Sequence, residues 1–181
     1  MKFLLPIFTF LLGSCMHQRT EHSKALRQFT MEYEKSLRPL YWFQRMGYGG
    51  ALMHDIAEVS LTYAVLVDHD VASAREVAMD CIELFTTMIN ADEKVQPYLH
   101  ERPFPPERFR LTLSIRNPDC SRYMGKGVSS VVFVHGKFGY FQYDPTTDYS
   151  TCLHSETYEE AKRIIDQKNR DTDKPASNPK I

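Results

Sequence analysis

The chain has 181 residues, of which 43% are apolar and 25% are charged, and its 22 basic side chains nearly balance 23 acidic ones. This composition is typical of a globular protein, and the length favours one domain that buries a core without metal or disulfide support. Because the net charge is near zero and no run of lysine or arginine occurs, nucleic acids are disfavoured as partners.

The N-terminus follows the order of a secretory signal peptide. Lys2 supplies a positive start, residues 3–12 are almost entirely apolar, and Gly13 and Ser14 are small residues directly before Cys15. A transmembrane helix needs about 20 apolar residues, so this stretch is too short to span a bilayer. We therefore predict a signal peptide over residues 1–14.

The four residues Leu12-Gly13-Ser14-Cys15 resemble the lipobox of bacterial lipoproteins. The resemblance implies that Cys15 is the lipid attachment site and the first residue of the mature protein, which several acyl chains would hold firmly on a membrane of the cell envelope. Met16 replaces the aspartate that commonly retains such proteins in the inner membrane, so the outer membrane is favoured. The alternative is an ordinary signal peptide cleaved nearby, with Cys15 an incidental thiol.

Residues 15–50 are predicted as a lipid-anchored N-terminal helix followed by an aromatic and glycine-rich linker. Apolar residues spaced by three and four predict a narrow amphipathic helix that Pro39 ends, and they are Leu26, Phe29, Tyr33 and Leu37. The aromatic residues at 41–43 then lead to glycines at 47, 49 and 50, which we interpret as a hinge. These aromatic side chains either rest on lipid headgroups or, as we prefer, cover one side of the core.

Residues 51–168 are predicted as an α+β domain. The ranges 53–67 and 71–89 are apolar at helical spacing and predict two helices, with a turn or a bend at 68–70 between them. Four prolines between residues 97 and 106 then enforce an extended connection.

The sequence of the second half of this domain predicts an antiparallel meander followed by a terminal helix. Strict alternation over 108–116 indicates a strand, the ranges 128–134 and 138–143 indicate a hairpin, and 149–153 indicates a short fourth strand. A capping box at Thr157 begins the helix, and residues 169–181 are predicted to be a disordered tail. The fold class is therefore α+β, with N-terminal helices packed on a three- to four-stranded antiparallel meander and a C-terminal helix.

A second resemblance involves the middle and the end of the chain. The segments 89–90, 95–100, 103–104 and 156–161 resemble a group of small exported bacterial proteins, over a likeness that extends from about residue 49 to residue 165. This resemblance implies a module and assigns no reaction or site residues.

The cysteines predict at most one intrachain bridge. Setting Cys15 aside, Cys81 falls on the apolar side of a predicted helix and is interpreted as a buried thiol. Cys120 and Cys152 both lie near turns, so they are the better pair for a disulfide in an oxidising compartment.

Few residues suggest chemistry. His54 and Glu58 share a helical face if residues 53–67 are helical, but a metal site needs further ligands, and no catalytic or phosphate-binding motif is present, so we expect no cofactor. Tyr98 and His100 lie in the proline-restricted linker, where a rigid loop could present them to a ligand.

Two functions are compatible with these observations. The first is a lipid-anchored envelope protein that acts as a noncatalytic binding or interaction module for a protein or small ligand. The second is an envelope hydrolase that uses His54, Glu58 or His100, which requires these groups to converge in a pocket. A third possibility, an assembly component, requires an exposed apolar patch over residues 41–48.

Replacement of Cys15 with alanine should abolish labelling by a clickable fatty acid and release the protein from membranes, because the lipid is the expected anchor. The measurement is in-gel fluorescence after metabolic labelling, together with fractionation. Persistent labelling of the variant would exclude Cys15 as the lipid attachment site.

Overall fold

The computed structural model describes residues 21–172, so the predicted signal peptide, Cys15 and residues 173–181 lie outside the described residues. The described chain forms helices, strands and two short 3-10 turns, η1 (Gln96–Tyr98) and η2 (Pro106–Arg108). The helices and strands in chain order are α1 (Glu21–Leu37), β1 (Phe43–Ala51), β2 (Glu58–Val65), α2 (Val71–Ala91), β3 (Phe109–Ile115), β4 (Ser130–Val134), β5 (Lys137–Asp144), β6 (Tyr149–Thr157) and α3 (Tyr158–Thr172).

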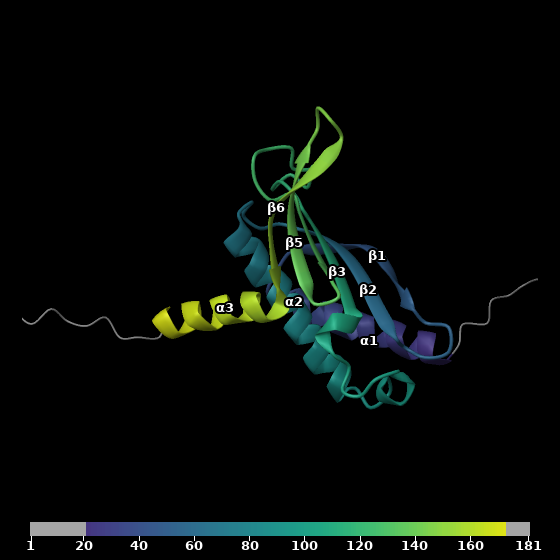
Figure 1. Ribbon diagram of the computed structural model, residues 1–181. Coiled ribbons are helices and arrows are strands. Elements are labelled where there is room, and N and C mark those ends of the chain that lie inside the picture. Colours follow the sequence, from purple (N-terminus) through teal and green to yellow (C-terminus); the bar gives the residue numbers. More distant parts are fainter. Residues whose placement is uncertain (1–20, 173–181) are drawn as a thin grey trace, which may run out of the picture.

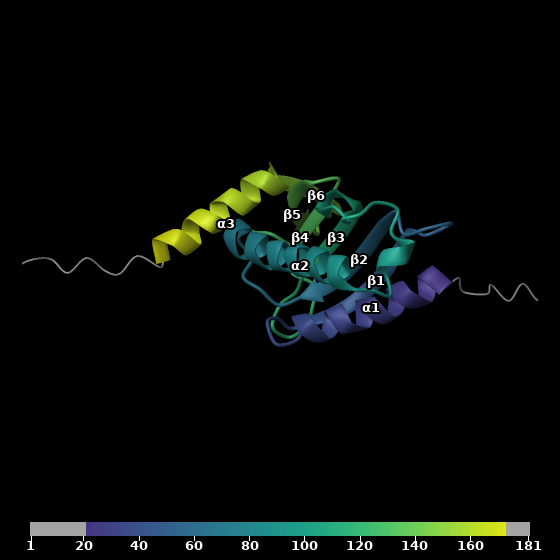
Figure 2. The same cartoon turned by 90° about the horizontal axis from the view of Figure 1, so that it is seen from below.

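The strands form one sheet of six in the order β1-β2-β3-β4-β5-β6 (Figure 1). Every neighbouring pair is antiparallel except β2 and β3, which are parallel. A parallel pair requires a crossover, and α2 provides it. Seen from below, α1 and α2 cover one face of the sheet and α2 lies between α1 and α3 (Figure 2). The predicted α+β class is thus confirmed, whereas the predicted strand number and purely antiparallel pairing are wrong.

The largest correction concerns residues 53–67, which contain β2 and not a helix. Val59, Leu61, Tyr63 and Val65 are buried at every second position, which is the period of a strand. β2 hydrogen-bonds β1 on one side and β3 on the other, and Ala64 on its second face is buried as well. Glu58, Ser60 and Thr62 alternate with these buried residues, so the local pattern is that of a strand, and the helical prediction overlooked it.

The predicted linker contains the edge strand β1, and its glycines lie in the strand where a hinge was predicted. The predicted domain boundary at residue 50 falls within β1, which pairs along its length with β2. Phe43 packs edge-on against Tyr63, with ring centroids 5.1 Å apart, and so covers part of the core as expected. Trp42, by contrast, stays exposed.

Several local predictions are confirmed. α1 buries the predicted stripe of apolar residues. The alternatives left open at 68–70 resolve as a turn, in which Asp70 caps α2 by accepting a hydrogen bond from the Ser73 backbone N–H at 2.9 Å. His135 and Gly136 both have positive φ in the two-residue turn between β4 and β5. α3 begins as predicted but continues to Thr172, so residues 169–172 of the predicted tail are helical.

The core is centred on Phe85 of α2. Its ring stacks on Phe109 of β3 with a centroid separation of 4.0 Å and meets Phe29 and Tyr33 of α1 edge-on at 5.3 and 5.2 Å. The Tyr33 hydroxyl also donates to the Cys81 carbonyl at 2.8 Å, which fixes α1 on α2. Residues on both sides of the predicted boundary at residue 50 therefore share one core.

Two neighbouring glycines of β1 provide a matched test of the pairing between β1 and β2. Gly50 has a φ of 148°, and a methyl group added there would overlap the Glu58 carbonyl, whereas a methyl group at Gly49 meets nothing within 4 Å. We expect Gly50→Ala to lower the free energy of unfolding by about 2 kcal/mol and Gly49→Ala to change it by less than about 0.5 kcal/mol. Urea denaturation measures both values, and equal losses would contradict the β1–β2 register.

Candidate functional site

The residues of the hydrolase hypothesis lie apart. His54 is exposed in the bend between β1 and β2, and Glu58 forms an ion pair with Arg110 at 2.8 Å on the sheet face away from the helices. His100 Nδ1 lies 2.6 Å from an oxygen of Asp55, and both side chains are exposed. The expected i, i+4 face of His54 and Glu58 does not form because this segment is not helical. Within residues 21–172 no three histidine, cysteine or acidic side chains group as metal ligands do.

The predicted ligand loop is docked on the body of the protein. Ile56 donates its N–H to the Tyr98 carbonyl at 2.8 Å and accepts from the His100 N–H at 3.2 Å, a short parallel bridge. Leu99 between them is buried, and the Tyr98 ring lies 6.2 Å from His22. This loop therefore connects α2 to the sheet, and only the His100 ring projects outward.

The predicted disulfide is absent, and the cysteines occupy different environments. Cys120 and Cys152 are exposed free thiols. Cys120 lines a hollow beside Trp42 and Ala64, near the β1 edge of the sheet, whereas Cys152 lies on the edge strand β6 at the opposite side. Both cysteines lie near turns, as the prediction assumed, but these turns are at opposite sides of the sheet. Cys81 is buried as predicted, and burial raises the pKa of its thiol to about 12.

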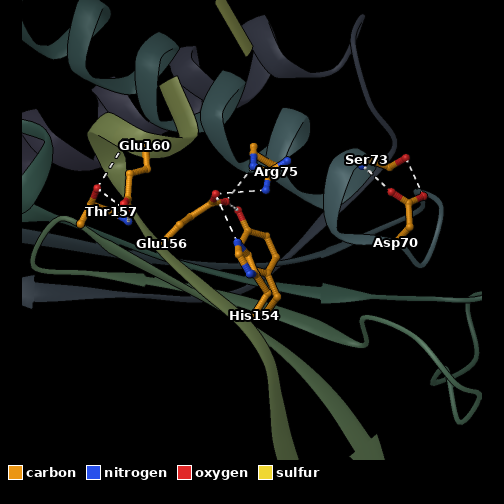
Figure 3. Close-up of polar contacts among 8 residues, drawn as sticks. Asp70, Ser73, Arg75, His154, Glu156, Thr157 and Glu160 are labelled. Carbon is orange, nitrogen blue, oxygen red and sulfur yellow. Dashed lines mark hydrogen bonds and ion pairs between the residues drawn. The ribbon is translucent and has the colours of Figure 1, made fainter. Parts of the chain in front are cut away.

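One buried polar group was missed by the sequence interpretation, and we call it the Glu156 cluster (Figure 3). Arg75 of α2 donates two hydrogen bonds to the Glu156 carboxylate of β6, at 2.7 and 3.0 Å. The Tyr140 hydroxyl of β5 donates to the same carboxylate at 2.6 Å, and His154 Nε2 lies 3.4 Å away. The Arg75 and Glu156 side chains are only 11% and 4% exposed, so water screens this pair weakly.

The positions of Glu156 and Tyr140 follow from local features of the sequence. Glu156 and Tyr140 face the helices because their strands alternate, and Glu156 directly precedes the capping box in which the Thr157 hydroxyl and the Glu160 carboxylate bond each other's backbone N–H at 3.2 and 2.8 Å (Figure 3). The cluster borders a hollow of about 230 Å³ that also contains Arg163.

Within the Glu156 cluster, Glu156 stays ionised and Tyr140 stays neutral near pH 7. Burial alone would raise the pKa of Glu156, but hydrogen bonds from Arg75 and Tyr140 outweigh it and hold that pKa below its ordinary value. Burial and the bond to Glu156 raise the pKa of Tyr140. General acid–base catalysis needs a group that titrates near the working pH. Glu156 and Tyr140 do not, and the two hydrogen bonds from Arg75 to Glu156 suit a structural ion pair that holds β6 on α2.

Exposed apolar side chains also occur along β1 and beside its two ends, and we call this segment the β1 edge. It comprises the side chains of Leu40, Trp42, Met46, Tyr48 and Met53, which are between 40% and 84% exposed. Among the described residues these are five of the ten large apolar side chains that are exposed. β1 pairs only with β2, so its outer backbone groups have no strand partner in the sheet. The β1 edge thus combines an unpaired strand edge with apolar side chains from both faces of the sheet, because Trp42 and Met46 line a hollow beside Ala64 whereas Tyr48 pairs with the core residue Leu61.

Comparison of the chain with protein-family models, with curated proteins and with solved structures found no match in any of the three. Of the helices in residues 21–172, none has the length and apolar character needed to cross a bilayer. What this chain does is therefore proposed from its own residues.

The structural role of Glu156 predicts a stability change that depends on pH. Glu156→Gln leaves Arg75 buried without its counter-charge and should lower the free energy of unfolding by about 3 kcal/mol at pH 7. Since the folded pKa of Glu156 lies below the unfolded value of about 4.3, its contribution is complete above that value and is lost as the pH falls through the folded pKa. The difference between the two proteins should therefore shrink below about pH 4.

Urea denaturation at several pH values measures this difference. The control is Glu159→Gln, a neighbouring exposed carboxylate on α3, which should change stability by less than about 0.5 kcal/mol. A Glu156 variant as stable as this control would show that the ion pair does not hold β6 on α2.

Proposed function

We propose that this chain is a lipid-anchored protein of the bacterial cell envelope that acts as a noncatalytic interaction module, with the β1 edge as its contact surface. The lipobox resemblance supports an anchor at Cys15, and Met16 favours the outer membrane. In this proposal the folded part, which begins with α1, stands beside the membrane and presents one edge of its sheet.

The exposure of the β1 edge is the observation that carries the proposal. Apolar side chains of this size are normally buried, and a group of them on a soluble surface marks an interaction site. Trp42, Met46 and Tyr48 fall within residues 41–48, where exposed apolar side chains were expected of an assembly component, and their exposure supports an interaction through this segment. An unpaired strand edge would otherwise invite aggregation, so a natural partner also protects the protein.

The hydrolase alternative has one observation in its favour. A histidine held by a carboxylate, as His100 is by Asp55, occurs in catalytic triads, where the histidine also contacts a nucleophile. In the described part of the chain no serine, threonine or cysteine side chain hydrogen-bonds the His100 ring. The pair is also exposed to water, where a buried catalytic carboxylate would be expected. The interaction proposal therefore has the stronger support.

Photocrosslinking in living cells tests the proposed contact surface. Benzoylphenylalanine in place of Met46 should give a discrete adduct with lipid or protein, because this side chain projects from the β1 edge. The same probe in place of Thr151, exposed on the opposite edge strand β6, should give none. Mass spectrometry identifies the adducts, and equal yields at the two positions would contradict the proposal.

A further inference from the structure

A hollow of about 400 Å³ lies between the first half of α1 and the strand β1, and we call it the α1–β1 hollow. Its lining residues are Ser23, Arg27, Arg45, Tyr48 and Leu52. Arg45 and Tyr48 project to the helix side of the sheet because they pair with Tyr63 and Leu61, which both point into the core. The α1 and β1 segments that border the hollow are joined by the contacts of Glu34 with Arg45 and of His22 with the Leu52 carbonyl.

The α1–β1 hollow has an excess of positive charge. Arg27 and Arg45 both line it, and Glu34 offsets part of this charge through its contact with Arg45 at 3.1 Å. Within residues 21–172 the Arg27 guanidinium forms neither an ion pair nor a side-chain hydrogen bond. Guanidinium groups bind phosphate oxygens through paired N–H donors, so this hollow suits a phosphate group.

The surroundings of the hollow are apolar. Tyr48 belongs to both the hollow and the β1 edge, Leu52 lines its end, and Met53 next to it is 84% exposed. Trp42 lies further along the same edge, where it lines a separate hollow with Met46 and Ala64, and tryptophan and tyrosine are favoured at the interface between lipid and water. A ligand that combines a phosphate with adjoining hydrocarbon fits this pattern, and a phospholipid has both parts.

The α1–β1 hollow lies close in the chain to the expected lipid anchor, which is consistent with a phospholipid ligand. Glu21, the first residue of α1, follows Cys15 by six residues, which span at most about 20 Å. His22 Nε2 lies 2.8 Å from the Leu52 carbonyl, so the start of α1 is fixed beside the turn that follows β1. A lipid on Cys15 would therefore hold the bilayer surface within reach of the α1–β1 hollow.

We propose that the α1–β1 hollow binds the phosphate of an anionic phospholipid headgroup through Arg27 and Arg45, and that the β1 edge lies against the bilayer. This inference rests on the proposed function, because the anchor brings the hollow to the membrane. It names an anionic phospholipid surface as the partner of the β1 edge. The fold is then oriented on the membrane as well as tethered to it.

Calorimetric titration of the full chain carrying Cys15→Ala tests the site without the protein's own lipid. The probes are dihexanoyl phosphatidylglycerol, dihexanoyl phosphatidylcholine and inorganic phosphate. We expect phosphatidylglycerol to bind most tightly, with an affinity that falls about fivefold in Arg27→Gln or Arg45→Gln and about twentyfold in the double variant. Arg163→Gln, which removes an exposed arginine on α3, is the matched control and should leave the affinity unchanged.

Any of the following outcomes would contradict the proposed lipid site. Equal affinity for the two lipids would show that the headgroup charge is not recognised, and phosphate binding as tight as that of phosphatidylglycerol would assign the hollow to free phosphate. Arg27 is exposed, so Arg27→Gln should fold normally, and circular dichroism checks this. An unchanged affinity in that folded variant would exclude the hollow.

The only tryptophan of the chain, Trp42, gives a second readout. On phosphatidylglycerol vesicles its fluorescence should be quenched by brominated acyl chains, and Arg27→Gln should reduce this quenching. Unquenched emission from vesicle-bound protein would show that the β1 edge faces away from the bilayer. Fatty-acid labelling of Cys15 tests the anchor separately, so a failed anchor and a failed headgroup site are distinguishable.

Discussion

The packing of α2 on the parallel strands β2 and β3 is the contact on which the rest of the molecule depends. Phe85 of α2 stacks on Phe109 of β3 and meets Tyr33 of α1, so one side chain joins the N-terminal helix to the centre of the sheet. Arg75, near the start of the same helix, holds β6 through Glu156. β1 lies at one edge of the sheet, where its outer side has no strand partner.

Local signals predict most of the second half of the fold. The alternation in Phe109–Ile115, the turn at His135-Gly136 and the capping box at Thr157 each act within a few residues, and each is present in the structure. The first half depends on distant contacts. β2 alternates polar and apolar residues as a strand does, but its parallel pairing with β3, in which Val59 lies opposite Phe109, is encoded by no local pattern.

The candidate sites also differ in whether they depend on local signals or on distant contacts. The hypothesis of a shared face for His54 and Glu58 required a helix, and it failed with that helix. Arg75 and Glu156 are 81 residues apart in the sequence, so their pairing could not be predicted without knowing that α2 packs across the sheet. The aromatic residues near 41–48 were singled out from the sequence, but their exposure depends on β1 being an edge strand. Residue type indicated this surface, and topology determined which side chains remain outside.

The parallel seam between β2 and β3 also governs how the sheet assembles. The β1–β2 hairpin and the meander from β3 to β6 each form from neighbouring segments, whereas Val59 must find Phe109 across the whole of α2. Contacts between residues so distant in sequence form slowly. Until they form, the two halves expose complementary strand edges that can also pair with another chain. A nascent chain that meets a second copy at this stage could exchange halves with it, so correct maturation depends on the two halves closing before such an encounter.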